Sequence, residues 1–272
     1  MSATDKVRSD HGPGIKSHST RDQRWRISSC KLPILKADPI EQMNKDLGIP
    51  VPEMIFGDNF VIIEHQASKL RLDFNAFDAL DKVSKTKDGM LQVAVAEEWK
   101  KERQHQDGIK EVVKPFDWSY STDFCGLTVG ASTGWQPTTE QENPIRTDLL
   151  SRHDPILFFD DVVLYEDELA DNGIAMFSVK VRVMPERMLL LSRFFLRLDG
   201  VIVRVRDTRV YIELGSNRII RQYTAKEDTY DKMRSKLQGR RENVPEALRD
   251  SNLMSSMLPV VEDRLEYLDV SG

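Results

Sequence analysis

The sequence predicts an α+β protein in which layered antiparallel β-sheets form a sandwich-like core and helices lie at the periphery. Two features carry this prediction. Between Met176 and Tyr211, successive runs alternate apolar and polar residues with a period of two, which is the pattern of half-buried strands. Asp199-Gly200 separates the last two runs, and this dipeptide is a strong signal for a hairpin turn. Strands joined by such turns are antiparallel, because parallel neighbours need crossover connections.

The N-terminal part of the chain predicts a tail followed by short elements. Residues 1–24 have almost nothing to bury and are expected to be a disordered tail. A helix is predicted over 38–48, where Asp-Pro opens an apolar face that ends at a glycine. Asn75 is expected to cap a short helix over 75–85, with Asp78 in its first turn. Strands are expected near residues 25–35, 60–65 and 70–74.

The middle of the chain is less regular. Residues 90–104 begin with strand-like alternation and continue with residues that favour a helix, so their structure is ambiguous from the sequence. Aromatic and polar residues alternate at 118–123 and predict a strand. Residues 130–155 are polar and rich in turn residues, and we expect them to form an exposed loop.

The strand after the Asp199-Gly200 turn contains an unusual acid. Val201, Val203 and Val205 share one face, and Asp207 falls in register with them. A buried carboxylate needs a cationic or hydrogen-bonding partner. Asp207 therefore marks either the end of the strand or a functional site.

We expect one domain over residues 25–240. A strand at 156–164 precedes the central runs, and a strand at 218–223 and a helix at 230–237 follow them. Residues 241–272 are expected to be a C-terminal extension that is partly flexible.

The composition narrows the class of protein. A chain of 272 residues with 31% charged and 40% hydrophobic residues has the balance of a soluble globular protein, and its net charge of −5 disfavours nucleic acid as a partner. Cys30 and Cys125 cannot form a disulfide framework, and no Cys/His cluster has zinc-site spacing, so we expect neither metal nor cofactor. We expect no secretory signal and no membrane span, and hence an intracellular protein.

One catalytic motif is present by pattern. Gly130 to Gly134 match G-x-S-x-G, which is a nucleophile elbow only where a strand turns sharply into a helix. No helical pattern follows, and the only downstream histidine, His153, lies in the same polar loop. We expect a loop of small residues, and a hydrolase that uses Ser132 is the alternative.

Arginines gather on both strands of the central hairpin. Arg193 and Arg197 precede the turn and Arg204 and Arg206 follow it, and we expect all four to project from one face, with Arg209 just beyond. Guanidinium groups in such a patch form a receptor for carboxylates or phosphates. The patch predicts a recognition surface for an acidic peptide; a solvated sheet surface on a structural scaffold is the alternative.

Several long segments are specific enough to indicate a family. They are PEMIFGDN (52–59), FNAFDAL (74–80), EVVKPFDWSYSTDF (111–124), LYEDELADNG (164–173) and RFFLRLDGVIVRVRDTRVY (193–211). Together they closely resemble the TOR signalling pathway regulator (TIPRL-like) proteins, over about residues 52–223. The loop 130–150 departs from the family pattern.

The resemblance implies a non-enzymatic regulator. Proteins of this family bind the catalytic subunit of type 2A-like serine/threonine protein phosphatases and act in TOR-linked and DNA-damage checkpoint signalling. A cleft holds the C-terminal tail of that subunit, and other phosphatase regulators are possible further partners. The expected location is the cytoplasm, with the nucleus as a second site, and neither nucleic acid nor a membrane is an expected partner.

The resemblance also points to site residues. In the family pattern, binding depends on Asp78 and on the strand that carries Arg204, Val205 and Asp207. We expect an acidic, aromatic tail in a groove between the sheet and the 75–85 helix, with arginines on its carboxylates, valines as the apolar wall and the two acids orienting the arginines. The expected partner-binding residues are Asp78, Val203, Arg204, Val205, Arg206, Asp207 and Arg209.

Overall fold

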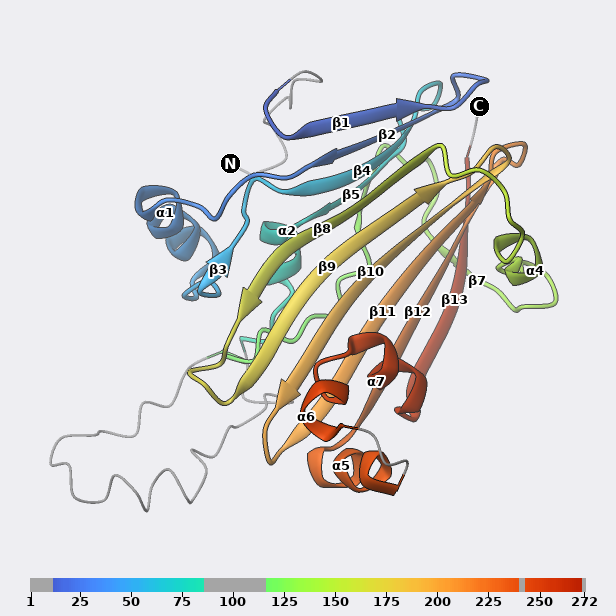
Figure 1. The fold of residues 1–272 in the computed structure, drawn as a ribbon. Helices are drawn as coiled ribbons and strands as arrows, with labels where there is room; N and C mark the ends of the chain where they lie inside the picture. Colours follow the sequence, from blue (N-terminus) through green and yellow to red (C-terminus); the bar gives the residue numbers. More distant parts are fainter. Residues whose placement is uncertain (1–11, 86–115, 240–242, 271–272) are drawn as a thin grey trace, which may run out of the picture.

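The computed structural model describes residues 12–85, 116–239 and 243–270. They form two antiparallel sheets with short helices around them, which confirms the predicted α+β class (Figure 1). The larger sheet has eight strands in the order β3-β8-β9-β10-β11-β12-β13-β7. Its strands are β3 (Met54–Ile55), β7 (Gln136–Pro137), β8 (Phe158–Asp167), β9 (Gly173–Val183), β10 (Arg187–Leu198), β11 (Ile202–Glu213), β12 (Arg218–Thr229) and β13 (Val260–Asp269).

The smaller sheet has five strands in the order β1-β2-β4-β5-β6. They are β1 (Ile15–Ser19), β2 (Trp25–Cys30), β4 (Phe60–His65), β5 (Arg71–Asn75) and β6 (Leu127–Val129). The helices are α1 (Ala37–Leu47), α2 (Ala76–Asp81), α4 (Thr147–Leu150), α5 (Tyr230–Gly239), α6 (Val244–Ala247) and α7 (Ser251–Met257). None of these helices in the described ranges is long and apolar enough to cross a membrane.

The β10–β11 hairpin determines which side chains share a face of the large sheet. The hairpin lies where Asp199-Gly200 predicted it, but its loop has three residues, Asp199, Gly200 and Val201, because Leu198 pairs with Ile202; Gly200 takes a left-handed φ of +71° in this loop. In the observed register Phe194 lies opposite Arg206, and Phe195 lies opposite Val205. Directly opposite residues project from the same side, so even-numbered and odd-numbered residues of these two strands lie on different faces.

One face of the large sheet, here called the inner face, packs against the small sheet. Figure 1 shows the small sheet stacked across β8 and β9. The buried core between the sheets joins large-sheet residues to small-sheet residues, among them Phe177, Phe194, Leu196, Ile27, Ile63 and Phe74. Burial of these side chains is the main favourable contribution to the fold.

A buried ionic contact also ties the two sheets together. Asp160 of β8 accepts a hydrogen bond from Ser29 Oγ of β2 at 2.6 Å and lies 2.5 Å from Lys31 Nζ. Burial disfavours the charged carboxylate, but the contacts with Lys31 and Ser29 outweigh burial and hold the pKa of Asp160 below its usual value. Asp160 is therefore a satisfied buried acid that fixes the two sheets to each other.

The opposite, outer face of the large sheet carries the C-terminal helices. Phe195, Val203 and Val205 project from this face and pack in a second core with Met233 of α5 and Met254 of α7. In Figure 1, α5, α6 and α7 lie across one end of β10–β12, whereas α4 lies near the other end of the sheet. The middle of the outer face is left between these two groups of helices.

His65 gives the small sheet a pH dependence that can be measured. It is buried, its ring lies 4.8 Å from that of Trp25, and its Nε2 has no hydrogen-bond partner among the described residues. Burial, with Arg24 nearby, lowers the pKa of His65 below its ordinary value of about 6.5. At pH 7 the His65 ring is mainly neutral in both the folded and the unfolded protein, but the unfolded chain gains a proton first as the pH falls.

We expect the free energy of unfolding to decrease as the pH falls below about 6.5, with a His65 contribution of at most about 1.4 kcal/mol per pH unit. Urea denaturation at several pH values measures this decrease. The His65→Gln variant, which cannot titrate there, should show a smaller decrease over the same range. An equal pH dependence in the variant and the wild type would contradict the assignment to His65.

Two ordered segments lie where flexible ends were predicted. β1 falls inside the predicted tail 1–24 and pairs with β2 along its whole length. Its sequence, IKSHS, has one large apolar residue, so no hydrophobic pattern marks the strand. β13 and α7 fall inside the predicted extension 241–272, and β13 pairs with β12. Because Leu268 is the one fully buried residue of β13, its strand pattern is also weak.

The strand predicted at 118–123 is wrong. This segment forms turns and irregular backbone. Its aromatic side chains nevertheless reach the core, where Phe116, Tyr120 and Phe124 are buried between the sheets. The alternation of aromatic and polar residues thus reflects insertion of side chains from a loop. The ambiguous segment 90–104 lies outside the described residues.

Candidate functional site

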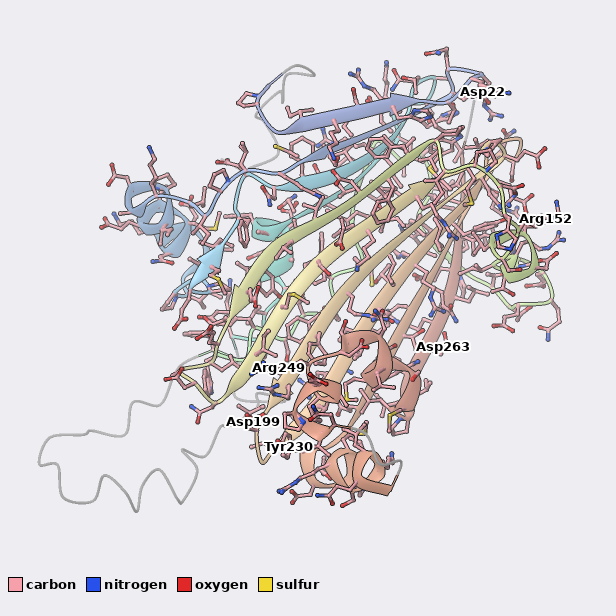
Figure 2. The ribbon with its side chains drawn as sticks, viewed as in Figure 1. Asp22, Arg152, Asp199, Tyr230, Arg249 and Asp263 are labelled. Atoms are coloured by element: carbon pink, nitrogen blue, oxygen red, sulfur yellow. The ribbon has the colours of Figure 1, made fainter. Side chains whose placement is uncertain are left out.

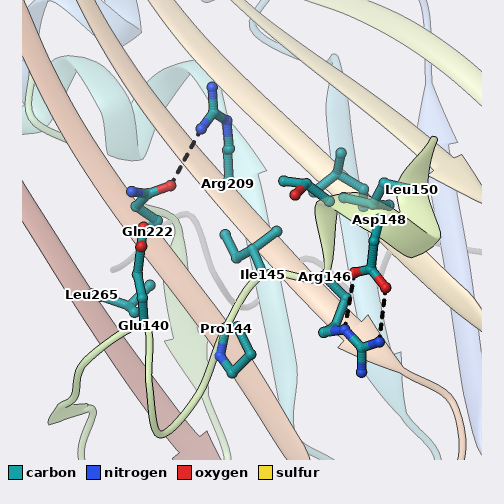
Figure 3. Close-up of a pocket in the computed structure, with 11 residues that line it drawn as sticks. Glu140, Pro144, Ile145, Arg146, Asp148, Leu150, Arg209, Gln222 and Leu265 are labelled. Atoms are coloured by element: carbon teal, nitrogen blue, oxygen red, sulfur yellow. Dashed lines mark hydrogen bonds and ion pairs between the residues drawn. The ribbon is translucent and has the colours of Figure 1, made fainter.

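The outer face of the large sheet is hollowed between α4 and α7. The larger hollow, the large pocket, has a volume of about 680 Å³ and is shown in Figure 3. It is lined by Glu140, Pro144, Ile145, Arg146, Thr147, Asp148, Leu150, Leu189, Arg209, Gln222 and Leu265. A small pocket of about 110 Å³ is lined by Asp161, Val163, Met176, Ser178, Lys180, Leu191, Arg193, Ser251 and Asn252.

The two pockets adjoin along strand β10. Leu189, Leu191 and Arg193 alternate along β10 on the outer face; Leu189 lines the large pocket, and the other two line the small one. Leu191 also lies directly opposite Arg209 of the large pocket. Together the pockets form one depression, here called the outer trough. Figure 2 labels Arg152 just beyond α4 and Arg249 just beyond α6, which mark the two ends of this face.

Arg209 is the distinctive charge in the outer trough. It is half-buried, and its Nη1 donates a hydrogen bond to Gln222 Oε1 at 3.3 Å. Gln222 in turn donates from Nε2 to the carboxylate of Asp263 at 3.1 Å. Among the described residues no carboxylate forms an ion pair with Arg209. The guanidinium therefore retains donors for an incoming anion.

The neighbouring arginines are different. Every other arginine of β10, β11 and β12 has a carboxylate within ion-pair distance. The pairs are Arg187–Asp154, Arg193–Asp207, Arg197–Asp199, Arg204–Glu227, Arg206–Glu227, Arg218–Asp269 and Arg221–Glu266. Binding an anion at Arg209 would break none of these pairs.

The rest of the large pocket consists of one ion pair, in which both charges already have a partner, and apolar side chains. Arg146 and Asp148 pair at 2.8 Å, and the hydrogen bond from Arg146 lowers the pKa of Asp148 to about 2. Ile145, Leu189 and Leu265 provide apolar walls. A guanidinium that forms no ion pair with the described residues, beside apolar walls, is suited to a ligand that carries a carboxylate next to a hydrophobic or aromatic group.

A buried polar network fixes α7 at the edge of the trough. Arg193 Nε and Nη2 donate to the two carboxylate oxygens of Asp207, each at 2.7 Å, and Ser255 Oγ of α7 donates to Asp207 at 3.2 Å. Arg193 Nη1 also donates to Asn252 Oδ1 of α7 at 2.8 Å. Asp250 caps the same helix by accepting from the backbone N–H of Asn252. Asp207 therefore has the cationic partner that its place among the valines required.

The arginine patch predicted from the sequence does not exist as one face. The register puts Arg193 and Arg197 on the outer face but Arg204 and Arg206 on the inner face. Arg204 and Arg206 share the carboxylate of Glu227, at 2.7 and 2.8 Å, and Arg204 Nη1 also donates to Ser121 Oγ at 2.9 Å. Arg204 thus connects Ser121 to the sheet.

The remaining predicted residues are also distributed over the fold. Val203 and Val205 are fully buried on the outer face, beneath the C-terminal helices. Asp78 is half-buried in α2, where Asn75 caps the helix as predicted: Asn75 Oδ1 accepts from Asp78 N, and Asn75 Nδ2 donates to Asp78 Oδ2 at 2.6 Å. Of the predicted set, the outer face brings together Val203, Val205, Asp207 and Arg209.

Sequence reasoning missed the α4 segment and Gln222. Residues 140–150 looked like an exposed loop, and no local pattern shows that they close over β10–β13. The partner of Asp207 was missed because it depends on the length of the hairpin loop. Leu198 pairs with Ile202, so the loop has three residues and Arg193 lies opposite Asp207, whereas a two-residue turn would put Arg193 opposite Arg206.

Ser132 does not have the setting of a nucleophile elbow. It is exposed in a bend between β6 and β7, and the element that follows is a two-residue strand instead of a helix. Within the described ranges no group of three or more His, Cys, Asp or Glu side chains is arranged to hold a metal ion.

Comparison with known proteins gives one consistent match. Residues 54–234 match the sequence model of the TIP41-like family. A human protein named TIP41-like protein is 41% identical over 247 residues, which cover 90% of this chain and 86% of that protein. Two yeast proteins are named type 2A phosphatase activators. The Saccharomyces cerevisiae protein is 39% identical over 261 residues (90% of this chain, 72% of that protein), and the Schizosaccharomyces pombe protein is 34% identical over 245 residues (90% and 95%).

Proposed function

Because this chain belongs to the TIP41-like family, we propose that it is a non-enzymatic regulator that binds the catalytic subunit of type 2A-like protein phosphatases. The observation that carries the proposal is the similarity, along 90% of the chain, to two relatives named type 2A phosphatase activators. Regulation is by binding, and the resemblance described above connects it to TOR-linked and DNA-damage checkpoint signalling in the cytoplasm and nucleus.

The outer trough receives the C-terminal tail of the catalytic subunit in this proposal. The tail is expected to be acidic and aromatic, and the large pocket offers apolar walls beside a guanidinium that has no ion-pair partner in the part of the chain that the structure describes. Its volume of about 680 Å³ is in the usual range for ligand pockets and accommodates a few residues of an extended peptide. The small pocket continues the trough and takes a further side chain of the same peptide.

Arg209 is therefore the arginine that we assign to the tail carboxylates. Arg204 and Arg206 face the other way and already share Glu227, so an anion there would have to displace an existing partner. Val203, Val205 and Asp207 contribute to binding indirectly, because they support the helices that border the trough. Asp78 contributes by fixing α2 through its contacts with Asn75.

A titration with isolated phosphatase catalytic subunit, with and without its last few residues, tests this proposal. We expect the intact subunit to bind and deletion of the tail to weaken binding by more than about tenfold, because a hot-spot contact is lost. A synthetic tail peptide should compete with the intact subunit. Equal affinity for the intact and the truncated subunit would refute the assignment of the tail to the outer trough. If the protein binds no catalytic subunit of this phosphatase group, the proposed regulatory function is wrong.

A further inference from the structure

An exposed apolar patch spans the start of strand β8 and the two residues before it. Ile156, Leu157 and Phe159, here called the β8 patch, have exposed fractions of 55%, 38% and 54%. Phe158 points the other way, where its ring stacks on that of His18. Single exposed apolar residues are common, but three large ones within four positions are typical of a surface that another molecule covers.

The β8 patch is continuous with the outer trough. Phe159 lies on the outer face directly opposite Arg182 of β9. Arg182 Nη2 donates to the carbonyl oxygen of Leu150, and Leu150 lines the large pocket. Asp161, two residues beyond Phe159 on the same face, lines the small pocket. Phe159 therefore lies at the border of the trough, next to both of its pockets.

We propose that the β8 patch contacts the folded domain of the phosphatase catalytic subunit whose tail occupies the outer trough. This inference rests on the proposed function and extends it from the tail to the body of the partner. A tail in the trough keeps the attached domain close to its rim. A few tail residues bury less area than stable protein complexes normally do, so a second contact on the domain is needed for a specific complex.

The opposite rim of the trough is a poorer candidate. Val260 and Val261 are also exposed there, at 54% and 57%. However, they begin an edge strand with a register irregularity at Lys226, and the acids Glu262 and Asp263 follow at once. Irregular pairing and charges are common protections of a free sheet edge against association.

The β8 patch has three large apolar residues instead of two, and β8 pairs regularly with β9 from Phe158 to Val163. Of the two acids that follow Phe159, Asp160 is buried on the inner face, so only Asp161 stands beside Phe159 on the outer face. The β8 patch therefore suits an apolar contact at an interface better than the opposite rim does.

Two linked contacts predict a characteristic dependence on the form of the partner. The tail alone should bind through the trough and should not need the β8 patch. The intact catalytic subunit should use both, because the second contact becomes intramolecular once the tail is bound. A substitution in the patch must then affect the two ligands differently.

The test compares the affinities of Phe159 variants for the intact catalytic subunit and for a synthetic tail peptide, by calorimetry or biolayer interferometry. Phe159→Ser should weaken binding of the intact subunit by about tenfold, the effect of losing one aromatic contact, and leave peptide binding unchanged. Phe159→Leu should recover most of the affinity. Ile34→Ser is the matched control, since Ile34 is 43% exposed but lies in the segment between β2 and α1, away from the large sheet's outer face.

Three outcomes would overturn the inference. In the first, Phe159→Ser leaves the affinity for the intact subunit unchanged. In the second, it weakens binding of the tail peptide as much as binding of the intact subunit, which would make Phe159 part of the tail site. Loss of affinity in Val261→Ser but not in Phe159→Ser would place the domain at the opposite rim. A wild-type protein that binds neither ligand refutes the proposed function instead, so the two failures are distinguishable.

Discussion

Replacing Arg209 with methionine should weaken binding of the phosphatase tail peptide by about 10- to 100-fold. Arg209 is half-buried in the large pocket and pairs with Gln222 instead of a carboxylate. Methionine keeps the length and apolar stem of the side chain but removes the donors for the tail. A hydrogen bond to a charged group contributes about 1.5–3 kcal/mol, which corresponds to this range of affinity.

The Arg209→Lys variant separates charge from geometry. Lysine keeps the positive charge but cannot form the paired hydrogen bonds of a guanidinium with a carboxylate, so we expect an intermediate affinity. Calorimetric titration of the peptide measures both variants. Neither should change the free energy of unfolding by more than about 0.5 kcal/mol, because no ion pair within the described residues is broken.

Arg204→Met is the matched control for Arg209→Met. Arg204 lies on the same strand as Arg209 but projects from the inner face, where it pairs with Glu227 and donates to Ser121. This variant should lose stability, since Glu227 keeps only Arg206 and Ser121 loses a donor, while it keeps its affinity for the peptide. If Arg204→Met weakens binding of the tail peptide and Arg209→Met does not, the tail binds on the inner face of the large sheet and the assignment of the outer trough is wrong.

A turn signal in the local sequence predicts that two strands pair, but it does not fix their register. Asp-Gly predicts the β10–β11 hairpin, and a two-residue turn there would put Arg193 opposite Arg206 and all four arginines on one face. The loop instead has three residues, because Leu198 pairs with Ile202, so Arg193 lies opposite Asp207. The predicted four-arginine patch fails for this reason: one extra loop residue moves every side chain of the second strand to the other face relative to the first strand.

Other parts depend on contacts between residues that are distant in sequence. β13 joins the sheet beside β12 although their first residues, Arg218 and Val260, are 42 positions apart (260 − 218), and with one buried residue β13 has no alternating apolar pattern. The α4 segment completes the large pocket by packing over strands that are distant in sequence. Thr147 and Leu265, for example, both line the pocket but are 118 positions apart (265 − 147). A period-two or helical pattern describes one element and its buried side, so it cannot reveal which elements meet.

Substitution of Asp207 should destabilise the protein by about 3–5 kcal/mol, because it leaves the Arg193 guanidinium buried without its carboxylate. Both side chains are largely buried, with exposed fractions of 10% for Arg193 and 3% for Asp207, and two hydrogen bonds of 2.7 Å join them. Urea denaturation of Asp207→Asn measures the loss. Hydrogen exchange should show faster opening of α7, since the amide leaves one acceptor oxygen, in place of two, for Arg193 and Ser255.

Weaker phosphatase binding by Asp207→Asn should then be a consequence of the loosened α7 wall. The double variant Arg193→Met/Asp207→Leu distinguishes this explanation from direct contact. It removes both charges and fills the site with apolar groups of similar size, which often restores the stability lost when one partner of a buried pair is removed. If Asp207 acts through α7, the double variant should regain much of the binding together with the stability. If stability returns and binding does not, the carboxylate itself contacts the phosphatase.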